Sequence, residues 1–419
     1  MGEIMNSLRR VVITGMGAIT PLGLDVESSW KSVVAGVSGV GPITLFDSSA
    51  LQVHIAAEAK GFDPANFMDV KDARRRDRYT QFAIAACREA MQQSGLKIED
   101  SLSDDVGVYV GTGVGGLGTY FESVKTVLSE GPRRINPFAI PMIIDDGASS
   151  AIAIEYGARG LNFAPVTACA AGSDAIGMAF RAIQRGEATA VIAGGAEAAV
   201  VLVGMAAFDR TGACSRRNDD PTHASRPFDK NREGLVFGEG AAIFVVEALD
   251  FALARGATPL AEIVGYGATS DAFHLTAPSS DGAGAARAIR KALRDANLGA
   301  ADIDWICAHG TATQLNDKME TLAIKSAFGE RAYQIPISGT KSMHGHIMGA
   351  TGAINVVWCI KAIQDGIIPP TLNYETPDPE LDLDYTPNQA RRHTVDVAIS
   401  NAFGFGGHNS VLIIRRYGE

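Results

Sequence analysis

Cys169 is the residue of this sequence best placed to act as a nucleophile. It follows a short β-branched run in the segment PVTACAAGSDAIGMAF (165–180) and precedes a helix-like pattern. This order predicts a strand-to-helix turn with the thiol at the positive end of the helix dipole, which lowers a thiol pKa and exposes the sulfur. Small neighbouring residues let backbone N–H groups point at an oxyanion on a substrate. A buried, inert cysteine is the alternative that the local pattern leaves open.

Two histidines and a lysine lie in or beside glycine-rich turns in the second half of the chain. His309 comes directly after the apolar run 303–308 and opens HGTAT, and His346 lies in TKSMHGHIMGATG together with Lys341. A thiol can form an acyl-thioester, and imidazole N–H groups can polarise a thioester carbonyl. We expect Lys341 to orient a histidine through its charge and hydrogen bonds. These residue types indicate acyl-transfer chemistry if the fold brings them to Cys169.

A metal site is a weaker alternative at the same histidines. His344 and His346 alternate on one turn, as zinc ligands can, with Asp317 or His309 as a third ligand. No further cluster of ligand-type residues completes a site at the usual spacing. We therefore expect no metal.

A glycine-rich run at 111–116 matches the GxGxxG pattern of a dinucleotide-binding loop. That loop must be followed by a helix and then by a second strand. Here the helix-like segment 119–129 leads into GPRRINPF, which is not a strand pattern. The hypothesis that the protein is a dehydrogenase therefore depends on this motif alone, and we expect no nicotinamide cofactor.

Short apolar runs alternate with longer amphipathic segments along the chain. This alternation predicts an α/β protein with buried sheets. We expect a glycine-containing turn directly after the first strand. The predicted helices include 81–94 and 283–296, and the predicted strands include 11–14, 106–110, 190–193, 241–246, 303–308 and 411–414.

An internal repeat relates the two halves of the chain. Residues 171–186 (AGSDAIGMAFRAIQRG) and 351–366 (TGAINVVWCIKAIQDG) share the ending AIQ-x-G. Residues 104–113 and 302–311 each combine an acidic turn, a strand and a glycine turn. Two matches in the same order favour a duplicated α/β unit over chance similarity. We expect the functional site to lie where the two units meet.

Composition narrows the class of protein. The chain has 419 residues, of which 47 are acidic and 37 basic, and a net charge of −10 disfavours a nucleic-acid or anionic-membrane partner. Five separated cysteines fit neither a disulfide framework nor a zinc ribbon, and they favour the reducing cytoplasm. The most apolar window, 188–208, contains Glu197 in its middle, which argues against a membrane span.

Four motifs together resemble the condensing enzymes: VTACAAG around Cys169, HGTAT at 309–313, TKSMHGH at 340–346 and NAFGFGGHN at 401–409. The sequence is most similar to the elongating β-ketoacyl-acyl-carrier-protein synthases of type II fatty-acid synthesis, in the synthase II branch, and the similarity spans nearly the whole chain. The resemblance implies the thiolase-like α/β fold, in which two pseudo-repeated halves form a five-layer α-β-α-β-α sandwich, normally as a homodimer. We place the two halves at 1–258 and 259–419.

The resemblance also implies a reaction. Cys169 takes the acyl chain from acyl carrier protein (ACP), and His309 and His346 hold the carbonyl of malonyl-ACP while CO2 leaves. The resulting carbanion attacks the acyl-cysteine and gives a β-ketoacyl-ACP two carbons longer. The resemblance also implies that Lys341 and Glu320 form a charged pair behind the histidines. It implies that the backbone N–H groups of Cys169 and Phe405 form an oxyanion hole, and that the Phe405 side chain is a mobile gate. Thr311 and Thr313 match residues that bind pantetheine, and Val114 and Phe208 match residues of the acyl pocket.

An acidic ACP requires a basic docking patch on this acidic chain. One expected arginine of the family's docking surface is Gly212 here, with Arg210 two residues away. A solvated run of charges is the alternative reading of such arginines. The positions that match the docking surface carry Arg74, Arg75, Arg76, Arg133 and Arg134.

Three departures from the family pattern leave the preferred chain length open. The unusual residues are Gln314 and Asn316 on either side of Leu315, His344 before the second histidine, and Asp145, Asp146 and Gly147 in the stretch that lines the acyl pocket near the dimer interface.

Other members of the same broad fold remain as alternatives. One alternative is a discrete ketosynthase of a polyketide or specialised-lipid pathway, which only substrate profiling can distinguish from a fatty-acid synthase. A non-catalytic chain-length factor lacks the nucleophile, so the intact Cys169 argues against it. A thiolase needs a second catalytic cysteine near the C-terminus, whereas the last cysteine here is Cys359, inside a helix pattern.

Overall fold

The computed structural model describes residues 8–418. Within these residues, ten strands form one mixed sheet in the order β10-β9-β13-β14-β8-β1-β7-β6-β4-β5. Its first half contains β1 (Val11–Ile19), β4 (Val106–Gly111), β5 (Asn162–Phe163), β6 (Ala190–Glu197) and β7 (Gly240–Ala248). Its second half contains β8 (Ala261–Ser270), β9 (Trp305–Cys307), β10 (Ile337–Ser338), β13 (Val397–Gly404) and β14 (His408–Arg415).

The two half-sheets have the same strand order and the same strand directions. In the first half, β4 is parallel to β5 and β6, whereas β7 is antiparallel to β6 and β1. In the second half, β9 is parallel to β10 and β13, whereas β14 is antiparallel to β13 and β8. The duplication inferred from the sequence is therefore confirmed, and β4 and β9, which carry the second sequence match, occupy equivalent places.

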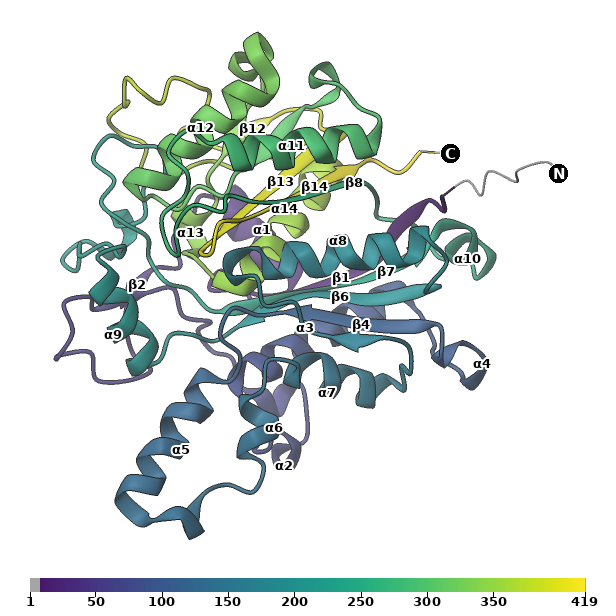
Figure 1. The fold of residues 1–419 in the computed structure, drawn as a ribbon, viewed down its shortest axis with the longest axis vertical. Coiled ribbons are helices and arrows are strands. Elements are labelled where there is room, and N and C mark those ends of the chain that lie inside the picture. The colour runs from purple at the N-terminus through teal and green to yellow at the C-terminus, as the bar shows by residue number, and fades with distance from the viewer. Residues whose placement is uncertain (1–7, 419) are drawn as a thin grey trace.

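Helices cover the half-sheets in three layers (Figure 1). Helices α3 (Arg78–Ser94) and α7 (Gly147–Tyr156) lie outside the first half-sheet, and α11 (Ala283–Ala296) and α12 (Gln314–Phe328) lie outside the second. Helices α8 (Ala171–Gln184) and α14 (Thr351–Asp365), which carry the first sequence match, pack together between the half-sheets. This is the five-layer α-β-α-β-α arrangement predicted from the resemblance.

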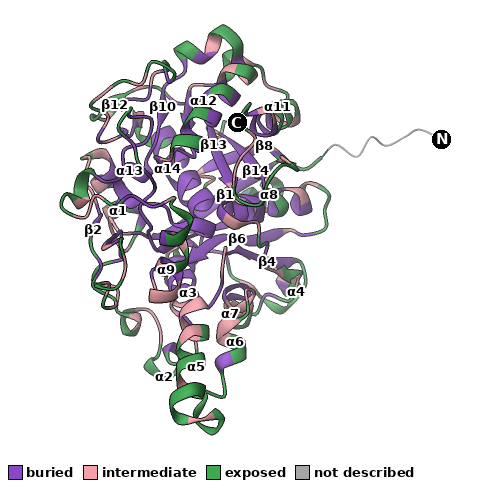
Figure 2. Cartoon of the chain, turned by 60° about the vertical axis from the view of Figure 1, so that its left-hand side comes forward, coloured by how far each residue is buried: buried purple, intermediate pink, exposed green. Residues whose placement is uncertain are grey.

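Smaller elements connect or extend these layers. Helix α5 projects from the first half together with α2 and α6, and it contains no buried residue (Figures 1 and 2). The remaining helices are α1 (Val26–Val34), α2 (Val70–Ala73), α4 (Asp100–Ser103), α5 (Leu117–Glu130), α6 (Ala139–Ile143), α9 (Leu202–Thr211), α10 (Leu249–Ala254) and α13 (Lys341–His344). Two short antiparallel pairs are β2 (Gly41–Pro42) with β3 (Ile55–Ala56), and β11 (Ile367–Ile368) with β12 (Arg391–Arg392).

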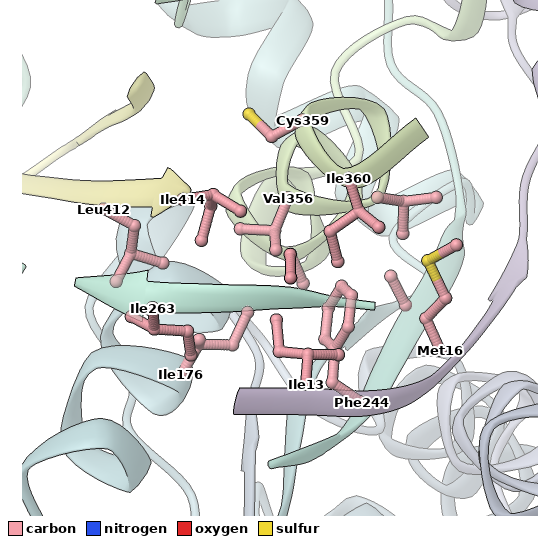
Figure 3. Packing of buried hydrophobic residues seen from close by; sticks show 14 of the residues in the cluster. Ile13, Met16, Ile176, Phe244, Ile263, Val356, Cys359, Ile360, Leu412 and Ile414 are labelled. Atoms are coloured by element: carbon pink, nitrogen blue, oxygen red, sulfur yellow. The ribbon is translucent and has the colours of Figure 1, made fainter. Parts of the chain in front are cut away.

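The core is built in the central layer. Strands such as β1 and β7 are apolar at almost every position because both faces of each half-sheet are covered by helices. Phe244 of β7, Ile263 of β8 and Leu412 of β14 meet Ile176 of α8 and Val356 of α14 in one buried cluster (Figure 3). This cluster joins the two halves and fixes the turns that precede α8 and α14.

Strand β1 is longer than predicted. The sequence indicated a turn after Thr14, whereas the strand continues to Ile19 through a register shift between Ile13 and Gly15. Helix α3 lies directly on this strand: a Cβ atom at Gly15 would lie 2.1 Å from the carbonyl oxygen of Ala90. The glycines therefore mark close packing of a helix on a strand rather than a turn.

The other predicted elements agree with the structure to within a few residues. Helix α11 has the predicted bounds, and α3 begins three residues before the predicted start at residue 81. Strand β9 is shorter than the apolar run 303–308. The apolar window 188–208 forms β6 and part of α9, and no helix within residues 8–418 is long and apolar enough to cross a membrane.

Candidate active site

Cys169 lies on the 3₁₀ turn η3 (Ala168–Ala170), directly before α8. The prediction that it precedes a helix is confirmed, but the preceding residues 164–167 are not a strand, since β5 ends at Phe163. Ala168 adopts a left-handed backbone conformation with a φ of 50°. That conformation is unfavourable for alanine and marks a tightly held turn at the thiol.

The prediction of an exposed thiol with a lowered pKa is wrong for this structure. Only 8% of Cys169 is exposed, and burial raises the pKa of its thiol to about 12. The nearby charge of Lys341 and the backbone N–H groups of Phe405 and Cys169 act in the opposite direction. Desolvation outweighs these contributions because the sulfur lies in a largely apolar pocket. In this structure Cys169 is therefore a neutral thiol at ordinary pH.

His346 contacts the nucleophile directly. Its Nε2 atom lies 2.9 Å from Cys169 Sγ, and its Nδ1 atom lies 3.1 Å from Thr351 Oγ1. Burial and the charge of Lys341 hold the pKa of His346 well below its usual range, so the imidazole is neutral. Because the Thr351 hydroxyl can donate to Nδ1, the single imidazole proton can reside on Nε2, where it faces the sulfur.

His309 is the second imidazole beside the thiol. Its ring centroid lies 5.4 Å from that of His346, with the two rings nearly perpendicular. Its Nδ1 atom is buried and has no hydrogen-bond partner among residues 8–418. Burial also holds the pKa of His309 well below its usual range. Two neutral imidazoles thus lie beside Cys169: His346 contacts the sulfur, and His309 keeps an unused ring nitrogen.

Glu320 and Lys341 hold the backbone of His309. Glu320 accepts hydrogen bonds from the backbone N–H groups of His309 and Gly310, both at 2.8 Å, and Lys341 Nζ donates to the carbonyl oxygen of His309. The expected charged pair is therefore not a direct ion pair: no contact within 4.0 Å joins the two charges among the described residues. Burial lowers the pKa of Lys341 to about 8. The geometry agrees with an orienting role for Lys341.

A cavity of about 340 Å³ opens beside these residues. Its walls are mostly apolar, and Cys169, His309 and His346 line it together with Phe208 and Phe405. Thr311 and Thr313 also line it, with their hydroxyl oxygens 3.0 Å apart. Val114 does not line this cavity; it packs against the neighbouring apolar cluster that contains Met348.

Phe405 lies in the hairpin between β13 and β14. Its ring centroid is 6.3 Å from that of Phe208, and its backbone N–H group points at the Cys169 thiol. Gly406 and Gly407 have φ values of 85° and 76°, which other residues adopt with difficulty. This chain segment can therefore supply both an oxyanion donor and an adjustable side chain at the cavity wall.

The glycine-rich loop after β4 binds a carboxylate of the protein itself. Thr112 Oγ1 and the backbone N–H of Gly113 donate to Glu197 at 3.1 and 2.7 Å, and the backbone N–H of Gly349 donates to the same group at 3.0 Å. The amides that a dinucleotide phosphate would need are therefore occupied. Sequence reasoning used Glu197 only as evidence against a membrane span, although a single carboxylate in an apolar strand was a usable signal.

The alternating histidines do not act together. His344 Nε2 lies 3.1 Å from Thr340 Oγ1, away from the partners of His346, and Asp317 accepts from the backbone N–H of Phe228. Within residues 8–418, no group of three or more His, Cys, Asp or Glu side chains is arranged to hold a metal ion. Among the other unusual residues, Gln314, Leu315 and Asn316 line the mouth of the cavity at the start of α12.

The unusual acidic pair lies next to the glycine-rich loop. A Cβ atom at Gly115 would lie 2.3 Å from Asp145 Oδ1, so the carboxyl group packs against the loop backbone. Burial and the neighbouring Asp146 raise the pKa of Asp145. The structure thus places this departure beside the nucleophile half of the site, and not in the wall of the described cavity.

Four of the five predicted docking arginines are exposed, and Arg76 is half-buried. Arg74 and Arg75 follow α2, and the guanidinium of Arg75 lies 4.6 Å from the ring centroid of Phe138. Arg133 and Arg134 lie in the 3₁₀ turn η2 (Pro132–Arg134), a few residues before Phe138, and both are exposed. Turn η2 packs against α5, where Arg134 lies 3.5 Å from Glu130, and Arg75 contacts Phe138, four residues further along the chain.

Comparison with known proteins identifies the family. The profile of the β-ketoacyl synthase N-terminal domain matches residues 8–252, and that of the C-terminal domain matches residues 260–375. The chain belongs to the β-ketoacyl synthase family. A 3-oxoacyl-[acyl-carrier-protein] synthase 2 of Synechocystis is 50% identical over 98% of both chains. A protein of the same name from Staphylococcus aureus is 46% identical over 99% of this chain and 100% of its own.

Solved structures of β-ketoacyl synthases have the same fold. A β-ketoacyl synthase from Burkholderia phymatum matches with a TM-score of 0.90 and 37% identity over 98% of this chain and 100% of its own. A type II polyketide ketosynthase in complex with its acyl-carrier protein matches with a TM-score of 0.91 and 33% identity over the same shares. The thiolase-like α/β fold predicted from the sequence is thereby confirmed.

Proposed function

We propose that this β-ketoacyl synthase elongates acyl chains carried by ACP in fatty-acid synthesis. The observation that carries the proposal is the arrangement of one thiol and two neutral imidazoles around a single, mostly apolar cavity. An acyl chain fits the apolar walls, while a thioester carbonyl needs the hydrogen-bond donors. Relatives of the same length that are 46–50% identical carry the name 3-oxoacyl-ACP synthase 2, which supports the assignment.

The first half-reaction loads the nucleophile. The sulfur of Cys169 attacks the acyl-thioester carbon, the bond to the ACP sulfur breaks, and the thiol proton passes to the departing ACP thiol. The backbone N–H groups of Cys169 and Phe405 stabilise the oxyanion in the transition state. The Nε2–H group of His346, 2.9 Å from the sulfur, stabilises negative charge on the sulfur during the attack.

The second half-reaction forms the carbon–carbon bond. His309 and His346 donate N–H groups to the carbonyl oxygen of malonyl-ACP, so that loss of CO2 leaves an enolate stabilised on oxygen. The enolate carbon attacks the acyl-Cys169 carbonyl, the carbon–sulfur bond breaks, and the cysteine recovers a proton from solvent. The product is β-ketoacyl-ACP extended by two carbons. Decarboxylation thus replaces removal of a proton from carbon.

Substrates would arrive on the phosphopantetheine arm of ACP, without a metal or a nicotinamide. Thr311 and Thr313 at the cavity wall supply hydroxyl groups for the amides of the arm. The exposed region formed by Arg74, Arg75, Arg133 and Arg134 supplies positive charge for an acidic carrier on a chain of net charge −10. The solved structure of the type II polyketide ketosynthase in complex with its acyl-carrier protein supports this partner.

A homodimer is the proposed assembly. Exposed apolar side chains lie at and near the edge strand β5. Ile154 is on α7, which packs against β5, Leu161 directly precedes β5, and Ile140 is on α6, which packs against α7; they are 81%, 65% and 68% exposed. An uncovered edge strand beside such a surface favours association with a second chain. We also propose that each subunit divides at 258/259, between α10 and β8, and that it works in the cytoplasm, where its five unpaired cysteines remain reduced.

A polyketide or specialised-lipid ketosynthase is the second candidate. Two observations favour it. Asp145 and Asp146 depart from the family pattern, and this chain is 33% identical to a solved type II polyketide ketosynthase and 39% identical to the solved ishigamide ketosynthase/chain length factor. A chain-length factor is disfavoured because Cys169, His309 and His346 form a complete site.

The test is intact-protein mass spectrometry after incubation with acyl-ACPs of several chain lengths, followed by malonyl-ACP. An adduct on Cys169 that discharges into β-ketoacyl-ACP supports the proposal, and saturated medium-length chains as the best donors support fatty-acid elongation. Loading only by polyene or aromatic donors would transfer the assignment to the second candidate. Absence of any adduct would overturn both.

A further inference from the structure

Glu197 is a buried carboxylate that the proposed mechanism does not use. It ends strand β6, is completely buried, and accepts hydrogen bonds from Thr112, Gly113 and Gly349. Thr112 and Gly113 belong to the loop after β4 in the first half. Gly349 belongs to the second half, in the 3₁₀ turn η7 (Met348–Ala350), three residues after His346. The Glu197 carboxylate therefore accepts hydrogen bonds from both halves of the protein at the place where they touch.

The two halves approach each other too closely for side chains at this contact. A Cβ atom at Gly349 would lie 2.4 Å from the backbone nitrogen of Gly113, and one at Gly172 or Gly195 would lie 2.7 Å from the carbonyl oxygen of Gly349. Real Cβ atoms do not approach backbone atoms so closely. The glycines permit the contact, and the Glu197 carboxylate supplies hydrogen bonds that fix its register.

This contact lies directly behind the reacting groups. Turn η7 packs against η3, the turn that carries Cys169, and His346 lies two residues before η7. Movement of η7 would therefore change the 2.9 Å separation between His346 Nε2 and Cys169 Sγ. In addition, the negative charge of Glu197 raises the pKa of the Cys169 thiol, whereas the charge of Lys341 lowers it.

We propose that Glu197 is a positioning residue that sets the spacing of Cys169 and His346 by hydrogen-bonding the loop after β4 to turn η7. Its carboxylate has a second, electrostatic role at the same contact. The inference deepens the proposed function and rests on it. Burial raises the pKa of Glu197 itself to about 7. The titratable groups coupled electrostatically to the two reacting side chains are Glu197 and Lys341 at Cys169, and Lys341, His344 and His309 at His346.

Two substitutions separate the charge from the geometry. In Glu197→Gln, the amide oxygen can accept from Gly113 and Gly349 while the amide N–H group donates to the Thr112 hydroxyl, so the contact is kept and the charge is lost. In Glu197→Asp, the charge is kept but the shorter side chain cannot reach both halves. Glu89→Gln is the matched control, because Glu89 is also a largely buried carboxylate that accepts two backbone N–H groups and has a pKa raised to about 7.

The first readout is alkylation of Cys169 by iodoacetamide as a function of pH, which needs no substrate. For Glu197→Gln we expect the alkylation midpoint to fall by at least about half a pH unit. For Glu197→Asp we expect a midpoint near that of the wild type, and acyl transfer slowed about tenfold or more, because the thiol and the imidazole lose their alignment. Glu89→Gln should match the wild type in both measurements.

Circular dichroism and thermal unfolding identify any variant that does not fold. If one variant fails to fold, the other still tests one role: Glu197→Gln tests the effect of the charge, and Glu197→Asp tests the positioning. An unchanged midpoint in folded Glu197→Gln would overturn the electrostatic role, and wild-type acyl transfer in folded Glu197→Asp would overturn the positioning role. If the wild-type protein itself does not condense acyl and malonyl groups, the proposed function fails, whereas the alkylation result stands separately.

Discussion

The Nε2 atom of His346 lies 2.9 Å from the Sγ atom of Cys169, across the contact between the two halves of the protein. Cys169 precedes α8, and His346 precedes α14, the equivalent helix of the second unit. The duplicated units thus present their equivalent turns to each other, one with a sulfur and the other with an imidazole. This relationship explains why two residues 177 positions apart can form one site beside the buried central layer of the fold.

Replacing the nucleophile should abolish turnover without unfolding the protein. Cys169→Ala removes only the sulfur from a small-residue turn, so we expect no acyl adduct and no detectable condensation. Intact mass spectrometry and a β-ketoacyl-ACP assay measure the two losses. Normal condensation by this variant would contradict the assignment of Cys169.

Replacing His309 or His346 by alanine should have the same effect on malonyl decarboxylation but different effects on Cys169 alkylation. His309→Ala and His346→Ala should both lose malonyl decarboxylation by about a hundredfold or more, since each removes one donor from the enolate oxygen. Only His346→Ala should also change the rate of Cys169 alkylation, because only His346 contacts the sulfur. Full decarboxylation in both variants would contradict the shared-donor role.

Lys341 should limit activity on the alkaline side. Because burial lowers its pKa to about 8, the folded protein loses this charge as pH rises through that value. The ammonium group lowers the thiol pKa and binds the His309 carbonyl, so we expect condensation to decline above about pH 8. Lys341→Met should give a low rate without this decline; persistence of the same decline would assign it to another group.

The sign of the Lys341 effect on stability is the reverse of its effect on activity. A lysine pKa that is lower in the folded state than in the unfolded chain means that, between about pH 8 and 10.5, only the unfolded chain keeps the proton. The contribution of this group to folding stability therefore rises with pH in that window. Urea unfolding of the wild type and of Lys341→Met across the window measures the difference.

Reversing charge in the arginine region should affect carrier-bound substrates selectively. We expect Arg75→Glu and Arg134→Glu to raise the apparent KM for acyl-ACP about tenfold and to leave the KM for pantetheine thioesters near its wild-type value. Arg294→Glu on α11, an exposed arginine in the second half, is the matched control. Equal effects on both substrate classes would remove the docking role.

A charge on the exposed apolar surface should prevent dimer formation. The side chain of Ile154 is 81% exposed beside the edge strand β5, so Ile154→Asp should not destabilise the monomer fold but should disfavour burial against a second chain. Light scattering after size exclusion should show a wild-type dimer of about twice the 44.0 kDa chain mass and a lighter variant. A wild-type monomer would refute the proposed assembly.

The sequence predicted the elements and the chemical groups better than it predicted their environment. The bounds of α11 follow from its regular alternation of small and basic residues, and the repeat at 171–186 and 351–366 indicated the duplication. The turn expected after Thr14 is absent because Gly15 and Gly17 make room for α3 within a continuing strand. Local pattern alone cannot show such packing.

The electrostatics of the site also depend on tertiary structure. A helix N-terminus predicts a lowered thiol pKa, but the surrounding cavity desolvates Cys169 and raises it. Glu320 and Lys341 were expected as a pair, whereas each binds a different part of the His309 backbone. Burial and hydrogen-bond partners come from residues distant in the sequence, so no local signal contained them.

The glycines at the contact of the halves restrict how this protein can move during turnover. Since backbone atoms of Gly113 and Gly349 are already packed together, the halves have no gap to close and no hinge about which to open. Ligand exchange must instead depend on small displacements of surface segments, such as the hairpin around Phe405, while the frame of the molecule keeps its shape. Small-angle scattering curves of the free and the acylated protein should therefore superimpose, in contrast to enzymes that close one domain over another.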